Sequence, residues 1–170
     1  MDTISEARLA QVHPALAARI YRMANLLAPQ TFRVAQGLRT FAEQAALYAQ
    51  GRTAPGNIVT DADAGYSMHN YGFAVDCYPN NPDGTIDWGP SHPDWKAMEQ
   101  CGVSVGLVSG ANFIRLVDAP HFELSGRFPS STTDEMRSLF ASGGLQAVWD
   151  AAGIPAVQTI PPPDPELGTS

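Results

Sequence analysis

The chain has 170 residues, of which 44% are hydrophobic, and this is enough for one domain with a hydrophobic core. Ten Lys and Arg residues stand against 17 Asp and Glu, so the net charge of −7 argues against nucleic acid as the main partner. No stretch approaches the roughly 20 apolar residues of a membrane span, so we expect no membrane insertion.

The start of the chain shows helical periodicity. Apolar side chains recur at three- and four-residue steps through 5–28, which indicates an amphipathic helix. Pro14 lies inside this pattern, and because proline suits a first helical turn but not a helix interior, we expect a second helix to begin there. Alternation over 31–36 then predicts a short strand with Phe32 and Val34 on the same face.

A capped helix, a long loop and a strand follow. Thr40 and Glu43 have the spacing of a capping box, which predicts a helix over 41–50. Residues 51–66 are rich in Gly, Pro, Asn and Asp, and we expect a loop there. Residues 71–78 are expected to form the next strand.

The rest of the first 128 residues predicts one helix and two more strands. The helix is expected over 93–101 with Gly102 as its end, and the strands are expected within 103–124. The strands are short, and hairpin-like connections outnumber strand–helix–strand units. We therefore predict an α+β fold with a small, mainly antiparallel sheet flanked by helices.

The C-terminal part predicts helices and then a proline-rich tail. Thr132 and Glu135 repeat the capping-box spacing before a helix over 133–142. A last short helix is expected over 145–152, and the tail that follows is expected to be extended or disordered.

The segment 67–76, with the sequence SMHNYGFAVD, is the most informative part of the chain. Strand alternation places Gly72, Ala74 and Asp76 on one face and hydrophobic residues on the other. The first face carries only small side chains and one carboxylate, and His69 lies in the turn just before it. A sheet face that carries only small side chains, beside a histidine and an aspartate, is typical of a functional site.

A second histidine lies on a later predicted strand. Alternation places His121 and Glu123 on the same face, while Asp118 precedes the strand. Two histidines and one carboxylate form a catalytic zinc set that leaves a fourth position for water. A second carboxylate would then accept the proton of that water. Asp118 can fill this role, and Glu123 is the competing candidate on geometry alone.

These motifs resemble the DD-peptidase family of zinc enzymes, which has the hedgehog/DD-peptidase fold. The family includes VanY-type D-alanyl-D-alanine carboxypeptidases, VanX-type dipeptidases and phage L-alanyl-D-glutamate endolysins. The resemblance extends over residues 31–125 and includes an upstream segment with Gly37, Arg39 and Gln44. Its most specific part is the pattern Ser67-x-His69-x-x-Gly72-x-Ala74-x-Asp76, followed by Asp118-x-x-His121.

The resemblance implies a role for the four central residues. Zinc would be held by His69, Asp76 and His121. Asp118 would act as the general base and then as the general acid. Some family members have glutamate at this position, and the shorter aspartate is found in the endolysin-like branch.

The resemblance also implies that three further residues act on the substrate. Arg39 would stabilise the oxyanion or hold a substrate carboxyl group, and Ser67 and Gln44 would contact the substrate. VanX-type enzymes carry two bulky aromatic residues where this chain has Ala119 and Pro120. This difference favours an endopeptidase with a larger substrate over a dipeptidase.

The function expected from this resemblance is a zinc metallopeptidase that hydrolyses the L-alanyl-D-glutamate bond in peptidoglycan. A D-alanyl-D-alanine carboxypeptidase and a non-catalytic peptidoglycan-binding module remain alternatives. A non-haem iron oxygenase also uses two histidines and a carboxylate, but the six-residue gap between His69 and Asp76 counts against it.

The expected organisation is a zinc peptidase core over 1–128, a helical extension of the same domain over 129–154 and a flexible tail over 155–170. The N-terminal segment lacks the basic start and apolar core of a signal peptide, so we expect synthesis in the cytoplasm. Access to the cell wall would then need a partner such as a holin. Cys77 and Cys101 are expected to be buried thiols rather than a disulfide.

Overall fold

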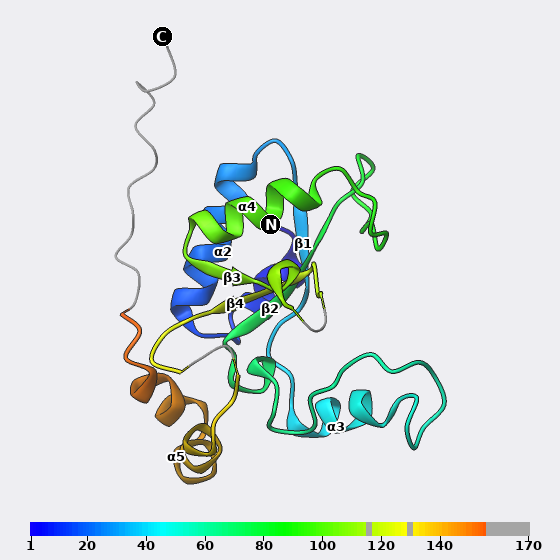
Figure 1. Cartoon of the computed structure of the whole chain (residues 1–170). Helices are drawn as coiled ribbons and strands as arrows, with labels where there is room; N and C mark the ends of the chain where they lie inside the picture. Colours follow the sequence, from blue (N-terminus) through cyan, green and yellow to red (C-terminus); the bar gives the residue numbers. More distant parts are fainter. Residues whose placement is uncertain (115–116, 129–130, 156–170) are drawn as a thin grey trace.

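A four-stranded antiparallel sheet forms the centre of the fold, which confirms the predicted α+β class (Figure 1). The computed structural model describes residues 1–114, 117–128 and 131–155. The strand order is β1-β2-β4-β3, and each neighbouring pair is antiparallel. The strands are β1 (Phe32–Gln36), β2 (Ala74–Pro79), β3 (Leu107–Ser109) and β4 (His121–Leu124).

Two helices cover one face of this sheet, and a third lies beside β1. In Figure 1, α2 and α4 lie side by side against the sheet, and both contact its strands. The loop after α3 extends away from the sheet, and α5 lies near the turn that precedes β2 (Figure 1). The helices are α1 (Thr3–Leu9), α2 (Pro14–Leu27), α3 (Phe41–Ala49), α4 (Trp95–Ser104) and α5 (Asp134–Ala152), and the 3₁₀ turns are η1 (Met68–Tyr71) and η2 (Gly110–Asn112).

The sheet separates a hydrophobic core from the face that carries polar side chains. Val75 and Cys77 of β2 and Phe122 of β4 are completely buried in the core. The alternate residues of the same strands, Asp76 and His121, point to the other face. The two faces predicted from strand alternation are therefore present, and the polar face is available for a site.

Most of the predicted elements are confirmed, including the two N-terminal helices, the second of which begins at Pro14. The Thr40–Glu43 capping box is also confirmed. The strand predicted over 71–78 begins only at Ala74, because η1 occupies the preceding residues and ends at Gly72 in a left-handed conformation (φ 68°).

Two predicted helix boundaries were wrong. Gly102 does not end α4, which continues to Ser104; Gly102 instead lies where α4 approaches the sheet most closely. The N-cap of α5 is Thr133 and not Thr132. Gly144, with a φ of 66°, interrupts α5, which agrees with the two helices predicted there.

Both cysteines are free thiols, with Cys77 buried and Cys101 half-buried. Across the part of the chain that the structure describes, none of the helices combines the length and the apolar character needed to cross a bilayer. The predicted tail is described only up to residue 155, and its remainder lies outside the described residues.

Candidate metal centre

The turn η1 fixes the position of His69 ahead of β2. The hydroxyl of Ser67 accepts a hydrogen bond from the backbone N–H of His69, and the side chain of Asn70 reaches back to the N–H of Ser67. Gly72 closes the turn in a left-handed conformation that residues with a Cβ rarely adopt. The ring of His69 is thereby directed over the polar face of the sheet.

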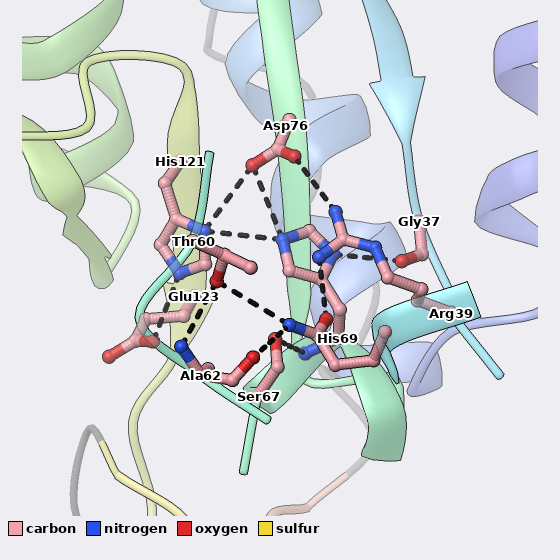
Figure 2. A network of polar contacts seen from close by, with 10 residues as sticks. Gly37, Arg39, Thr60, Ala62, Ser67, His69, Asp76, His121 and Glu123 are labelled. Atoms are coloured by element: carbon pink, nitrogen blue, oxygen red, sulfur yellow. Dashed lines mark hydrogen bonds and ion pairs between the residues drawn. The ribbon is translucent and has the colours of Figure 1, made fainter. Parts of the chain in front are cut away.

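Sheet pairing brings the second histidine and the aspartate together. Asp76 of β2 and His121 of β4 are directly opposite each other in the antiparallel register. Residues opposite each other in this way have neighbouring side chains on the same face. The pairing therefore places both side chains beside His69, as Figure 2 shows.

The three side chains form a nearly equilateral triangle of donor atoms. Asp76 Oδ1 lies 3.3 Å from both His69 Nε2 and His121 Nδ1, and these two nitrogens are also 3.3 Å apart. Ligands of a tetrahedral zinc ion at about 2.0–2.1 Å lie about 3.3–3.4 Å from one another. The donor types and all three separations therefore fit a zinc ion.

The second ring nitrogen of each histidine also has a partner. His69 Nδ1 lies 2.8 Å from the carbonyl oxygen of Gly37, and His121 Nε2 lies 3.1 Å from Glu123 Oε2. A carbonyl can only accept, so Nδ1 of His69 carries the proton and Nε2 presents its lone pair to the centre. Metal-binding histidines are usually held in this way by a carbonyl or carboxylate.

The charges at this centre are strongly coupled. Burial acts to raise the pKa of Asp76, but the neighbouring His69 and His121 outweigh this effect and hold its pKa well below the usual range. Burial acts to lower the pKa of His121, but hydrogen bonds with Asp76 and Glu123 raise this pKa to about 10. The metal-free centre therefore holds a proton strongly, which indicates a site built around a positive charge.

Asp118 lies beside this centre in the loop between η2 and β4. Its backbone N–H donates to the carbonyl of Gly110, and its own carbonyl accepts from the N–H of His121. Burial and the charge of Asp76 raise the pKa of its carboxyl group. Within the described ranges, no side chain donates a hydrogen bond to this carboxylate, which leaves it able to exchange a proton.

Arg39 lies beside Oδ2 of Asp76, the carboxylate oxygen that does not face the two histidines. Its Nη2 is 3.6 Å from Asp76 Oδ2, and its Nη1 donates to Oε1 of Gln44 at 2.8 Å. Its backbone is fixed by hydrogen bonds with His69 and Asn70. Arg39 is 9% exposed, and among the described residues its Nε has no hydrogen-bond partner. The guanidinium is therefore held in a fixed position, and its Nε–H group is not used by these contacts.

Gln44 is fully buried at the start of α3, and its amide is occupied by other parts of the chain. Besides accepting from Arg39, it donates to the carbonyl of Ala62 at 2.6 Å and to the hydroxyl of Thr60 at 3.4 Å. The sequence predicted that Gln44 contacts the substrate. Its side chain is instead occupied by Arg39 on one side and by the loop after α3 on the other, so it connects the guanidinium to that loop.

Four contributors to this arrangement were not predicted: the carbonyl of Gly37, Thr60, Ala62 and the turn η1. The carbonyl of Gly37 is a backbone group, and its role has no side-chain signature in the sequence. Thr60 and Ala62 belong to a loop whose path depends on long-range contacts with Gln44. The capping-box spacing of Ser67 and Asn70 around His69 could have indicated η1.

Comparisons with known proteins find one matching family model and several similar proteins. A peptidase M15 family model, described as D-alanyl-D-alanine carboxypeptidase, matches residues 60–124. The chain is 39% identical over 98 residues to the peptidoglycan L-alanyl-D-glutamate endopeptidase CwlK of Bacillus subtilis, in an alignment that covers 54% of this chain and 59% of CwlK. It thus spans less than two thirds of the length of that relative.

A second relative is covered more fully. The chain is 36% identical over 106 residues to the L-alanyl-D-glutamate peptidase of Escherichia phage T5, with 61% of this chain and 72% of the phage protein aligned.

Two solved structures are also similar. The Serratia marcescens L-Ala D-Glu endopeptidase ChiX has 25% identity and a TM-score of 0.48, covering 74% of this chain and 89% of ChiX. The L,D-carboxypeptidase DacB from Streptococcus pneumonia has 18% identity and the same TM-score, covering 78% of this chain and 72% of DacB.

Proposed function

The chain belongs to the M15 family of peptidases, and we propose that it is a zinc-dependent endopeptidase for the L-alanyl-D-glutamate bond of peptidoglycan. The observation that carries this proposal is the 3.3 Å triangle of His69, Asp76 and His121 with the carboxylate of Asp118 beside it. The two endopeptidase relatives support the choice of bond.

The proposed metal ligands are Nε2 of His69, Oδ1 of Asp76 and Nδ1 of His121. When bound, zinc supplies Lewis acidity, which polarises a carbonyl and lowers the pKa of water at the site to roughly 7. The carbonyl of Gly37 and the carboxylate of Glu123 hold the two imidazole rings in the orientation that ligation needs.

Asp118 is the proposed general base and acid. It would accept a proton from the attacking water and pass it to the amine that leaves when the peptide bond breaks. Its raised pKa supports this assignment, because a carboxylate with a higher pKa holds the proton better between the two steps. Glu123, the competing candidate, is 2% exposed and contacts His121, which supports a positioning role instead.

Arg39 is proposed to stabilise the negative charge that develops on the scissile carbonyl oxygen. Donors fixed before the reaction begins stabilise such a charge without reorganisation. The contacts of Arg39 with Asp76 and Gln44 provide this fixed position. Ser67 is proposed as a substrate contact, since its hydroxyl accepts from His69 and can still donate its own hydrogen.

A D-alanyl-D-alanine carboxypeptidase is the second candidate, because the matching family model carries that description. The two functions would use the same metal centre and differ in the bond presented to it. They give different products, since only the carboxypeptidase releases free D-alanine.

The test is digestion of purified peptidoglycan, with mass spectrometry of the released ends, in chelator and after zinc is restored. New N-terminal D-glutamate that disappears with chelator and returns with zinc would support the endopeptidase. Free D-alanine would instead indicate the carboxypeptidase. Absence of both products from zinc-loaded protein, with the Asp118→Asn variant as the inactive reference, would contradict both.

A further inference from the structure

A cavity of about 520 Å³ adjoins the metal centre on the side of Asp118. Tyr78 forms part of its wall, and because Tyr78 follows Asp76 by two positions on β2, both side chains lie on the same face of the sheet. Asp118 and Pro120 form the adjoining wall. The cavity is therefore a continuation of the polar face that holds the metal centre, and its volume is typical of small-ligand sites.

Three aromatic rings, those of Tyr78, Trp88 and Trp95, line this cavity. The ring of Tyr78 lies 4.6 Å from that of Trp88 and 5.6 Å from that of Trp95, measured between centroids. The indole N–H of Trp95 donates to the carbonyl of Gly89, which ties the connection between β2 and α4 to the helix. Trp88 is nevertheless 65% exposed. A clustered, exposed indole at a cavity wall offers a flat apolar surface to a ligand.

The charged groups of the cavity do not favour an anionic ligand. Lys96 is outnumbered by two acidic residues, Glu99 and Asp118, and the whole chain carries a net charge of −7. An anionic ligand would therefore be repelled here. A neutral ligand with one apolar face and several hydrogen-bonding groups fits the cavity better.

We propose that this cavity binds a neutral N-acetylated pyranose ring of the glycan strand, stacked on Trp88. The C–H groups on one face of a pyranose are apolar and pack on the negative face of an indole, while its hydroxyl and acetamido groups are able to reach Lys96 and Glu99. The proposal rests on the proposed function, because it is the peptidoglycan substrate that carries such a sugar next to the stem peptide.

The direct test is binding of a soluble N-acetylglucosamine tetramer to the full chain, followed by NMR or tryptophan fluorescence. The wild type should bind, Trp88→Ala should weaken binding by about tenfold, and Trp88→Phe should retain most of it because a ring remains. Tyr21→Ala removes another exposed ring, on α2 away from the cavity, and serves as the matched control. No binding by the wild type, or equal binding by Trp88→Ala, would overturn the proposal.

A second test compares cleavage of a disaccharide-linked stem peptide with cleavage of the same peptide without sugar. Trp88→Ala should lower the ratio of the two kcat/KM values by about tenfold, mainly through KM. An unchanged ratio would overturn the saccharide site. If the wild type binds the tetramer but cleaves neither substrate, the saccharide site stands and the proposed peptidase function fails.

Discussion

Oε2 of Glu123 lies 3.1 Å from Nε2 of His121, while the other nitrogen of the same ring, Nδ1, lies 3.3 Å from Oδ1 of Asp76. The carboxylate belongs to the residue two positions along β4, so strand geometry alone keeps it on the same face as the ring. One short segment thus supplies a proposed ligand and the group that orients it.

Replacing Glu123 with glutamine is expected to weaken zinc binding by about 10- to 100-fold. Glutamine keeps the size of the side chain but removes the charge that stabilises the ligated imidazole. Zinc affinity should be measured by competition with a chromophoric chelator, with the exposed Glu135→Gln substitution on α5 as the control. Equal zinc affinities for the Glu123→Gln and Glu135→Gln variants would contradict this role.

The stability of the metal-free protein is expected to fall as the pH rises towards 10. The pKa of His121 is raised from 6.5 to about 10, so the folded chain binds this proton more tightly than the unfolded chain. The resulting stabilisation is fully present below pH 6.5 and is lost as the pH rises through about 10. Urea unfolding in chelator at pH 7 and pH 10 measures it.

The His121→Gln variant isolates this contribution, because other groups that titrate near pH 10 remain in it. Its stability should depend less on pH across the same interval. A wild-type protein and a His121→Gln variant with the same pH dependence would show that the proton on His121 does not stabilise the fold.

Replacing Asp118 with asparagine is expected to lower kcat by about 10²- to 10⁴-fold while leaving zinc affinity nearly unchanged. The amide is almost the same size as the carboxylate but cannot accept the proton. Steady-state kinetics on a stem-peptide substrate, together with zinc titration, separates the two effects. Asp118→Glu should recover part of the activity, and full activity in Asp118→Asn would exclude the proposed base.

Replacing Gln44 with methionine is expected to reduce both stability and kcat. The substitution leaves Nη1 of Arg39 and the carbonyl of Ala62 without their partner, and each buried unpaired group costs about 1–3 kcal/mol. The loss in kcat should exceed the loss in zinc affinity, because Gln44 contacts Arg39 and none of the three proposed ligands. A variant that loses stability alone would show that Gln44 does not position Arg39 for the reaction.

Local patterns were sufficient to predict which residues share a face of the sheet. Alternation along β2 and β4 predicted that Asp76 and His121 point away from the core, and the register places them directly opposite each other. That register could not be read from the sequence, because strand pairing depends on contacts between distant segments. The position of Gln44 was unpredictable for the same reason, since its partners lie in a loop with no regular pattern.

The end of α4 shows a second limit of local patterns. Glycine after a helical segment usually marks its end, but Gly102 continues the helix because the ring of Phe122 packs against it. The pattern around Gly102 does not reveal why a glycine is needed there, because the contacting ring of Phe122 belongs to a strand some twenty positions later. Close packing, rather than the backbone freedom of glycine, selects the residue here.

Replacing Gly102 with alanine tests this explanation. Alanine in a helix interior is favoured over glycine by about 1 kcal/mol, but the new Cβ would come within 2.6 Å of Cδ1 of Phe122. Overpacking of a core costs about 1–3 kcal/mol, so we expect net destabilisation in urea unfolding. Phe122 lies between His121 and Glu123, so a displaced ring should also weaken zinc binding. Val103→Ala, on the exposed side of α4, should change neither quantity, and a Gly102→Ala variant more stable than the wild type would show that the packing is not tight.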